Sequence, residues 1–343
     1  MSPQALLTVT DLRVGFATEG GRLQAVDGVS FDLAPGEVLA IVGESGSGKS
    51  VTAMTIMGLT RGVNARFEGE ILYNGRDLLK VSEDEMQDYR GNEIGMIFQD
   101  PMTSLNPVYR IGEQIVEAIQ AHERVDKRTA RRRAIELLRQ VGIPNPESRV
   151  DDFPHQFSGG MRQRAMIAIA LSCNPDVLIA DEPTTALDVT IQAQIIELID
   201  QLKDDFNSAV ILITHDLGVV ADIADEIVVM YAGRIVERGV TRELFYDPQH
   251  PYTWGLLGSI PRLDRPRVER LHSIKGSPPS LIRLPEGCKF RPRCPHAFEK
   301  CREEPRLEQR VETPGHVDRC WLDVDFKRAH RDETISGGQT EAA

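Results

Sequence analysis

A glycine-rich segment, GESGSGKS, is the feature that most constrains the fold of this 343-residue chain. It follows the run VLAIVG, whose β-branched residues and neighbouring glycine are typical of a buried strand. The next segment, SVTAMTIMGL, has the pattern of a helix. A strand, a glycine-rich turn and a helix in this order direct backbone N–H groups and a helix N-terminus towards one point. The segment therefore predicts a phosphate-binding loop in an α/β protein with a parallel sheet.

The loop matches the pattern G-x-x-x-x-G-K-[ST] from Gly43 to Ser50. Lys49 would bridge the β- and γ-phosphates of a nucleotide, and Ser50 would offer its hydroxyl to Mg²⁺. The alternative is a chance turn rich in glycine and serine, which the flanking strand and helix disfavour. ATP and Mg²⁺ are the expected ligands, and the predicted contacts are Gly43, Glu44, Ser45, Gly46, Ser47, Gly48, Lys49, Ser50 and Val51.

An acidic strand end follows farther along the chain. The run VLIADE places Asp181 and Glu182 directly after a buried apolar stretch. Asp181 would hold Mg²⁺ through water, and Glu182 would orient and polarise the water that attacks the γ-phosphate. An acidic strand end alone is most simply a surface turn, but its occurrence together with the phosphate loop favours nucleotide hydrolysis.

A third segment, FSGGMRQRAMIAIAL, resembles the signature sequence of ABC-type ATPases, usually written LSGGQ, with Phe157 and Met161 as the departures. Ser158 stands where a helix N-cap is expected, and Gly159 and Gly160 would expose backbone N–H groups at the helix start. The resemblance implies that these three residues clamp ATP held by a second subunit, so a head-to-tail dimer is expected. The string ISGGQT near the C-terminus is rejected as a signature because no amphipathic helix follows it.

The other ABC-type motifs occur in the order that the family shows. The resemblance assigns Gln99 to the Q-loop, Asp188 to the D-loop at the dimer interface and His215 to the H-loop, which contacts the γ-phosphate. Phe16 is either the aromatic ring that stacks on adenine or a core residue of an early strand, and both interpretations stay open. The predicted catalytic residues are Glu182, His215, Lys49 and Gln99, and the predicted Mg²⁺ ligands are Ser50, Gln99 and Asp181.

Strands that alternate with helices predict a mostly parallel sheet, with strands at AVILITHD and at EIVVMYAGRIVERG, and the resemblance implies that this sheet is RecA-like. Two segments, IGEQIVEAIQAH and KRTARRRAIELLRQVGI, show the apolar spacing of helices. The resemblance adds an antiparallel β subdomain. The expected fold is therefore an α/β P-loop NTPase of the ABC ATPase type over residues 1–260, with a helical signature subdomain over 105–172. A small C-terminal region over 261–325 and a disordered tail over 326–343 would follow.

Three further segments narrow the resemblance to the ATPase subunits of oligopeptide/dipeptide importers, the peptide/opine/nickel group. They are FQDPMTSLNPVYRIGEQI, SGGMRQRAMIAIAL and HPYTWGLL. The resemblance implies an ATPase that energises peptide uptake, with nickel or another small solute as the alternative cargo. It also implies a paralogous ATPase in a heterodimer, two integral-membrane permease subunits and, indirectly, an extracytoplasmic solute-binding protein.

Four of the five cysteines form a cluster with the spacing C-x5-C-x6-C-x18-C, namely Cys288, Cys294, Cys301 and Cys320. Cysteines in this region of the same importer group are associated with a [4Fe–4S] cluster, so the resemblance implies that cofactor here. Four thiolates also suit Zn²⁺, although the spacing differs from the close cysteine pairs of zinc ribbons. A redox or metal-sensing role for this region is a further alternative.

The composition excludes other classes of protein. A formal net charge of −12 provides no broad basic field for nucleic acid. No run approaches the roughly 18 consecutive apolar residues that cross a bilayer, and the N-terminus lacks a secretory pattern. We expect a protein at the cytoplasmic face of the membrane, bound there through permease subunits. The single phosphate loop disfavours a soluble, non-transport ABC ATPase, and the signature and His215 disfavour a kinase or GTPase.

Overall fold

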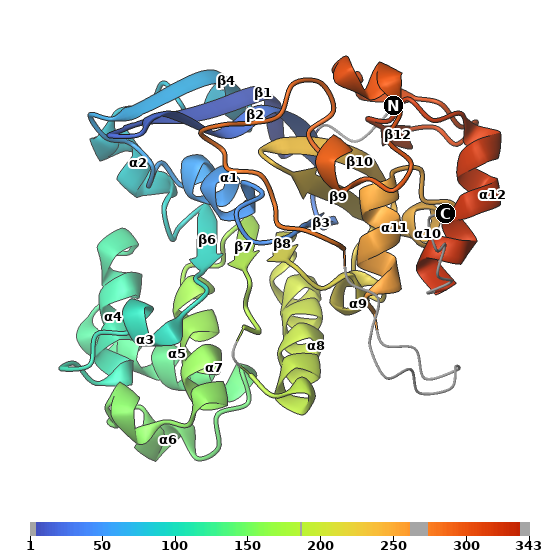
Figure 1. The fold of residues 1–343 in the computed structure, drawn as a ribbon. Coiled ribbons are helices and arrows are strands. Elements are labelled where there is room, and N and C mark those ends of the chain that lie inside the picture. Colours follow the sequence, from blue (N-terminus) through green and yellow to red (C-terminus); the bar gives the residue numbers. More distant parts are fainter. Residues whose placement is uncertain (1–4, 186, 261–273, 337–343) are drawn as a thin grey trace. The chain divides into compact units, whose positions relative to one another are not determined.

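The structure, a computed structural model, describes residues 5–185, 187–260 and 274–336 (Figure 1). Within them the chain forms two compact units. We call the first the signature unit, and it is built mainly from Leu33–Val38 and Lys80–Ile213. We call the second the phosphate-loop unit, and it is built from Leu7–Asp32, Leu39–Leu79 and the residues from Thr214 onward.

Three parallel strands, all of them buried along their length, form the sheet of the signature unit. Their order in space is β8 (Ala209–Thr214), β7 (Val177–Asp181) and β6 (Ile94–Ile97). Continuous apolar strands of this kind are typical of a parallel sheet that is covered on both faces. The helices next to these strands in the sequence include α2 (Glu83–Tyr89), α3 (Pro101–Ser104) and α8 (Val189–Phe206).

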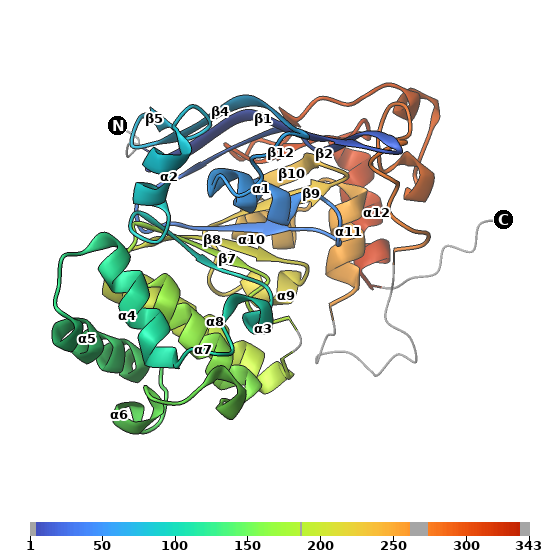
Figure 2. The same cartoon turned by 90° about the vertical axis from the view of Figure 1, so that its left-hand side faces the viewer.

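A group of helices lies between β6 and β7 in the sequence and appears in green in Figures 1 and 2. Ile111, Ile115 and Ile119 are buried along one face of α4, as the four-residue spacing requires. Asp126 caps α5 by accepting hydrogen bonds from two backbone N–H groups. The two helices predicted here are confirmed, and the group comprises α4 (Ile111–His122), α5 (Lys127–Gln140), α6 (Pro146–Arg149), the 3-10 turn η1 (Pro154–Gln156) and α7 (Gly159–Ala170).

The phosphate-loop unit contains an antiparallel sheet and a set of mixed strands. The antiparallel sheet has the order β2 (Gly21–Leu33), β1 (Leu7–Thr18), β4 (Ala65–Tyr73) and β5 (Arg76–Asp77), as expected for the antiparallel subdomain. In the mixed set, β3 runs parallel to β9, and the glycine-rich loop joins β3 to α1 (Lys49–Ile56), which confirms the predicted strand, loop and helix. The mixed strands are β3 (Val38–Val42), β9 (Glu226–Tyr231), β10 (Arg234–Val240), β12 (Val317–Asp318) and β11 (Glu308–Gln309).

The segment EIVVMYAGRIVERG folds as a hairpin, whereas a single strand was predicted. β9 and β10 are antiparallel, and Ala232 and Gly233 join them with φ angles of 49° and 82°. Two consecutive residues with positive φ form the tight turn that matches the twist of a hairpin. The apolar residues on both sides obscured this turn, because alanine is not a residue that normally signals it.

The C-terminal region adds strands to the sheet of the phosphate-loop unit. β12 pairs antiparallel with β10, with Asp318 opposite Glu237 and Val317 opposite Arg238. Backbone pairing therefore crosses the domain boundary that was predicted between residues 260 and 261. The helical segments of this part of the unit are α9 (Leu217–Val220), α10 (Thr241–Tyr246), α11 (Pro251–Gly258), η2 (Arg291–Arg293), η3 (Glu299–Arg302) and α12 (Val324–Ser336).

Helix α12 occupies the first part of the segment for which disorder was predicted from residue 326 onward. It lies beside α11 in both ribbon views (Figures 1 and 2). The carboxylate of Asp247 pairs with Arg328 at 2.7 Å and also with Arg331. These contacts join residues about 80 positions apart, so the local sequence could not reveal them. The string ISGGQT begins at the end of α12, and residues 337–343 lie outside the described residues.

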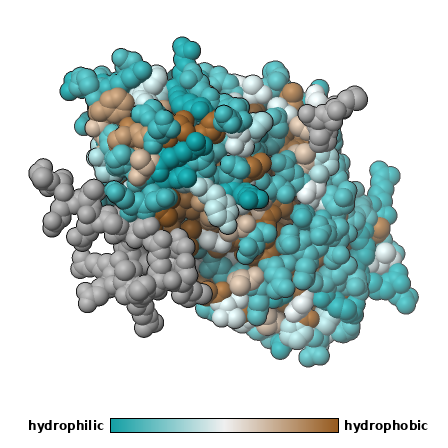
Figure 3. Space-filling model, turned by 90° about the vertical axis from the view of Figure 1, so that its right-hand side faces the viewer, coloured by the Kyte–Doolittle hydropathy of each residue, from teal (hydrophilic) through white to brown (hydrophobic). Residues whose placement is uncertain are grey.

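The surface on the side of α12 is mainly hydrophilic, with separate hydrophobic patches (Figure 3). The exposed residues of α12 include Asp325, Arg328, Asp332 and Glu333. Among the helices that the structure describes, none combines the length and the apolar character needed to span a membrane.

Candidate nucleotide-binding site

Three glycines give the phosphate loop a backbone that other residues could not adopt. Gly43, Gly46 and Gly48 have φ angles of 154°, 77° and 104°. A Cβ atom at Gly43 would lie 2.2 Å from the carbonyl oxygen of Met230, and one at Gly48 would lie 2.5 Å from that of Ala25. The loop therefore needs glycine both for its positive φ angles and for the close approach of neighbouring backbone.

The loop presents polar groups suited to an anionic ligand. Lys49 is only 4% exposed, and its Nζ donates hydrogen bonds to the carbonyl oxygens of Gly43 at 2.6 Å and Glu44 at 3.1 Å. These bonds hold the ammonium group within the loop. The hydroxyl of Ser47 is buried and has no hydrogen-bond partner among the described residues. A phosphate oxygen would supply the partner that this buried hydroxyl needs, so the loop fits a bound phosphate.

Two residues that the sequence did not reveal contact the loop at Glu44. The backbone N–H of Glu44 donates to the phenolic oxygen of Tyr252 at 2.7 Å. Its carboxylate accepts hydrogen bonds from both terminal nitrogens of Arg293, at 2.5 and 3.0 Å. Arg293 is 249 positions away, so no local pattern pointed to it. For Tyr252 the only signal was its place in the HPYTW motif.

The surroundings of these groups shift their titration. Burial lowers the pKa of Arg293, but hydrogen bonds with Glu44 and Tyr231 outweigh burial, and the pKa is raised. Burial raises the pKa of Tyr252, because it disfavours the charged phenolate, and the nearby Glu44 carboxylate raises it further. At neutral pH the cluster therefore holds a charged guanidinium and a neutral phenol beside the loop.

In the signature unit, the end of β7 places a predicted Mg²⁺ ligand, Asp181, next to a predicted catalytic residue, Glu182. Asp181 is the last residue of β7 and is 2% exposed. Glu182 follows it with a φ of 46°, a conformation that costs a non-glycine residue about 1–2 kcal/mol. Its Oε2 accepts hydrogen bonds from Gln99 Nε2 at 3.0 Å and from Thr185 Oγ1 at 2.9 Å. The two donors fix the direction of the carboxylate. Thr185 was not predicted.

The signature residues lie at the start of α7, where another helix start adjoins them. Ser158 Oγ accepts a hydrogen bond from the N–H of Met161 at 3.3 Å, which confirms the predicted N-cap. Asp188 caps α8 in the same way through the N–H of Ile191 at 3.0 Å. A Cβ atom at Gly160 would lie 3.2 Å from the Ile191 side chain, so the two helix starts are neighbours.

For two other predicted residues, His215 and Phe16, the structure gives a position and an exposure. His215 is exposed directly after β8, and Phe16 is half-buried on β1 opposite Ala65. A half-buried ring suits either interpretation of Phe16. Lys49, Ser50, His215 and Phe16 belong to the phosphate-loop unit, whereas the signature unit holds Gln99, Asp181, Glu182, Ser158, Gly159, Gly160 and Asp188.

Comparison with known proteins identifies the family of the chain. The ABC transporter family matches residues 26–185, and the family described as "Oligopeptide/dipeptide transporter, C-terminal region" matches residues 236–301. The chain is 56% identical over 319 residues to the oligopeptide transport ATP-binding protein OppD of Bacillus subtilis, covering 92% of this chain and 88% of that protein. The chain belongs to the oligopeptide/dipeptide ABC transporter ATPases.

Other relatives of this ABC ATPase agree with that assignment. It is 53% identical over 320 residues to the dipeptide transport ATP-binding protein DppD of Bacillus subtilis, covering 93% of this chain and 95% of that protein. Its fold resembles the ATP-binding cassette MJ0796, whose dimeric structure contains ADP and Pi. That match has a TM-score of 0.62 and 27% sequence identity, over 69% of this chain and 99% of MJ0796. The predicted ABC ATPase fold and ATP hydrolysis are thereby confirmed.

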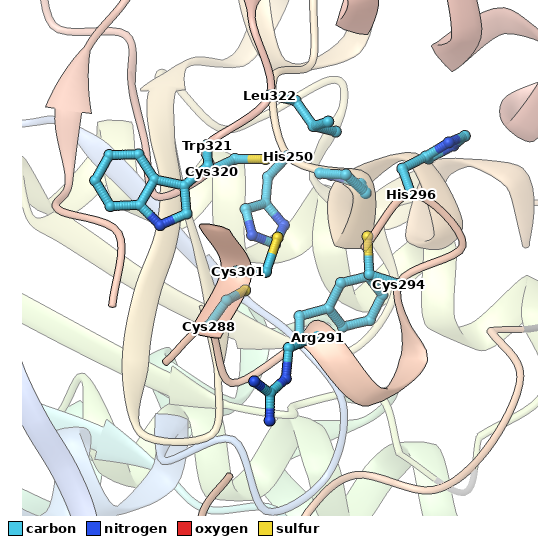
Figure 4. A pocket seen from close by; sticks show the side chains of 11 residues that line it. His250, Cys288, Arg291, Cys294, His296, Cys301, Cys320, Trp321 and Leu322 are labelled. Atoms are coloured by element: carbon cyan, nitrogen blue, oxygen red, sulfur yellow. The ribbon is translucent and has the colours of Figure 1, made fainter. Parts of the chain in front are cut away.

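The four clustered cysteines of the ABC ATPase line one small pocket in the phosphate-loop unit. Figure 4 shows their side chains around this pocket, close to His250. Cys301 and Cys320 are buried, and Cys288 and Cys294 are half-buried. The other residues that line it are Pro251, Phe290, Arg291, His296, Trp321 and Leu322.

The prediction that these cysteines bind a metal or an iron–sulfur cluster is wrong. In the parts of the chain that the structure describes, no three or more His, Cys, Asp or Glu side chains are arranged to hold a metal ion. Burial raises the pKa of Cys294 and Cys320 to about 12, and it also raises the pKa of Cys288. Because metals bind the thiolate form, these surroundings favour neutral thiols that act as small apolar side chains.

Proposed function

We propose that this ABC ATPase hydrolyses ATP to power the import of dipeptides and oligopeptides through a membrane transporter. The proposal rests on sequence identity. The chain is 56% identical to an oligopeptide transport ATP-binding protein over 92% of its length. It is 53% identical to a dipeptide transport ATP-binding protein over 93% of its length. Likeness over nearly the whole chain includes the C-terminal region, which a general ATP-binding cassette does not require. The alternative is a transporter for another cargo, such as nickel. The experiment below distinguishes that cargo from peptide.

The phosphate loop would bind the nucleotide. Lys49 would exchange its two backbone carbonyl acceptors for phosphate oxygens, and the hydroxyl of Ser47 would gain a partner. Ser50, Gln99 and Asp181 would hold Mg²⁺, which neutralises phosphate charge when it is bound. The three loop glycines support this proposal because they allow the positive φ angles and the close backbone approach that give the loop its shape.

Hydrolysis would depend on Glu182. Its carboxylate would orient and polarise the attacking water, while Lys49 and His215 would stabilise the charge that develops on the γ-phosphate. The hydrogen bonds from Gln99 and Thr185 support this role because they direct the carboxylate. Gln99 would also transmit changes at the nucleotide site to the membrane partner.

A second ATPase subunit would complete each site. Ser158, Gly159 and Gly160 would contact the ATP of that subunit in a head-to-tail dimer, and Asp188 would lie at the interface. The exposure of Ser158, Gly159 and Asp188 at adjoining helix starts supports this arrangement. We propose that the second subunit is a paralogue.

The membrane partners would be two permease subunits, which hold this chain at the cytoplasmic face of the membrane. A solute-binding protein would deliver the cargo to them from outside. No nucleic acid is expected to take part. Nucleotide-driven closing and opening of the ATPase dimer would be passed to the permeases near Gln99.

The proposal is tested by purifying the tagged chain from detergent-solubilised membranes of its own cells. We expect a second ATPase and two integral-membrane subunits to co-purify, with ATP turnover that peptide-loaded binding protein stimulates. Stimulation by nickel-loaded binding protein, but not by peptide, would reassign the cargo. Recovery of the chain without membrane subunits, together with ATP turnover in the soluble fraction, would overturn a transport role.

A further inference from the structure

The C-terminal region reaches the phosphate loop through one buried arginine. Arg293 lies at the end of η2, next to Cys294, and its side chain is 4% exposed. It meets the carboxylate of Glu44 with two parallel hydrogen bonds, a geometry that only a guanidinium provides. Glu44 is the second residue of the phosphate loop, so this contact joins the two segments directly.

The guanidinium is itself held firmly in place. Its Cζ lies 5.8 Å from the ring centre of Tyr231 and 6.0 Å from that of Phe290. Arg293 Nε donates to the carbonyl oxygen of Lys275 at 3.1 Å, and Nη2 donates to that of Ile274 at 3.3 Å. Because these contacts already hold the guanidinium of Arg293 in place, it loses little conformational freedom when it pairs with Glu44. It can therefore hold the Glu44 carboxylate in one orientation.

Glu44 in turn contacts the lysine that would bind phosphate. The carbonyl oxygen of Glu44 accepts a hydrogen bond from Lys49 Nζ, while its N–H is held by Tyr252. A displaced Glu44 would therefore move one of the acceptors of Lys49. The side chain of Glu44 is 29% exposed, and without a countercharge its carboxylate would repel the phosphates of ATP.

On the basis of the proposed function, we propose that Arg293 is a positioning residue for the phosphate loop. It orients Glu44 and neutralises its carboxylate, and the C-terminal region thereby sets the affinity of the loop for ATP. Nothing in this role requires Arg293 to touch the nucleotide. It also gives the C-terminal region a function in the ATPase cycle.

The test compares Mg-ATP binding and steady-state hydrolysis in the full-length chain and its variants. Arg293→Ala should raise both the Kd and the KM for ATP about tenfold, with kcat changed less than about twofold. The double variant Glu44→Gln, Arg293→Ala should recover most of the lost affinity, because it also removes the unneutralised carboxylate. Arg302→Ala is the matched control, since Arg302 is an exposed arginine of the same region that forms an ion pair with Glu299.

The possible outcomes separate this role from a merely structural one. Equal loss of affinity in the single and double variants would overturn the inference, because a structural role is not rescued at Glu44. Affinity equal to that of the unchanged chain in Arg293→Ala would also overturn it. If Arg293→Ala fails to fold, Arg293→Lys keeps the charge but not the paired hydrogen bonds, and a KM raised about threefold is expected. Failure of the unchanged chain to bind ATP would refute the proposed function instead.

Discussion

The two units each hold one glutamate beside a predicted nucleotide motif, and the surroundings of the two carboxylates differ. In the phosphate-loop unit, the carboxylate of Glu44 is paired with the guanidinium of Arg293. In the signature unit, the carboxylate of Glu182 accepts hydrogen bonds from an amide and a hydroxyl, those of Gln99 and Thr185. The ion pair offsets the negative charge of Glu44, and the two hydrogen bonds orient the carboxylate of Glu182.

This difference matches two different tasks. A loop that binds phosphates gains affinity when nearby negative charge is neutralised. A residue that polarises water needs its negative charge and a fixed direction. The positive φ of Glu182 agrees with the second task, because strained backbone is concentrated at functional sites. We therefore expect changes in the phosphate-loop unit to affect ATP binding first, and changes in the signature unit to affect turnover first.

The largest effect is expected for Glu182→Gln. The amide has the shape of the carboxylate but cannot act as a base, so kcat should fall about 10²–10⁴-fold while the Kd for Mg-ATP changes little. Single-turnover hydrolysis and equilibrium ATP binding measure the two quantities. Glu197→Gln, at an exposed position of α8, is the control and should hydrolyse ATP normally. Near-normal turnover of Glu182→Gln would show that this carboxylate does not activate the attacking water.

The next effect is expected for Gly43→Ala, with Gly46→Ala as its matched variant. Both residues have positive φ, which costs alanine about 1–2 kcal/mol. Only at Gly43 does the new Cβ meet backbone, at 2.2 Å from Met230, whereas nothing lies within 4 Å at Gly46. Gly43→Ala should therefore lower the free energy of unfolding by about 2–5 kcal/mol in total and abolish ATP binding. If Gly43→Ala and Gly46→Ala lose equal stability in chemical denaturation, a Cβ atom at Gly43 does not clash with the Met230 backbone, contrary to the structure.

Lys49→Ala should weaken ATP binding about 10- to 100-fold, because it removes charge-assisted hydrogen bonds to phosphate. Isothermal titration with Mg-ATP measures this change. Lys275→Ala is the control, since Lys275 contributes its backbone carbonyl to the Arg293 cluster and that group is unchanged by the substitution. A normal Kd for Lys49→Ala with reduced kcat would reverse the assignment of binding to the phosphate-loop unit.

The smallest effect is expected for Ser158→Ala. Its loss of the α7 cap should cost about 1 kcal/mol of stability, as should loss of the α5 cap in Asp126→Ala. Only Ser158→Ala should also lower the turnover of the assembled ATPase dimer, by about 2- to 10-fold. Thermal unfolding and ATP turnover of both variants separate the effect of a lost helix cap from that of a lost signature residue. An equal loss of turnover in Asp126→Ala would mean that stability alone explains the effect.

The sequence predicted those parts of the molecule whose causes are local. The strand, loop and helix around Lys49 follow from residue types in one short segment, as do α4, α5 and the Ser158 cap. The approach of Gln99 to Glu182 was not visible in either motif, but both residues were predicted because each belongs to a family motif. The elements are thus predictable where periodicity, glycine and capping residues specify them.

What the sequence did not predict depends on contacts between distant residues. The ion pairs of Asp247 hold α12, although its own polar sequence suggested disorder. The pair of Arg293 and Glu44 joins two segments with no shared pattern. The cysteine cluster and the family resemblance suggested a metal, whereas the arrangement of the described side chains and the buried thiols do not support one. Local patterns do not encode which distant side chains meet, so these features needed the folded chain.

ATP hydrolysis by this chain should power peptide import. The most direct measurement is uptake of a radiolabelled tripeptide into proteoliposomes that contain the purified transporter, with ATP on the side of the ATPase subunits and binding protein on the other. We predict uptake that requires ATP and falls to background when the chain carries Glu182→Gln. Uptake that persists at the normal rate with Glu182→Gln, or no ATP-dependent uptake with the unchanged chain, would contradict the claim.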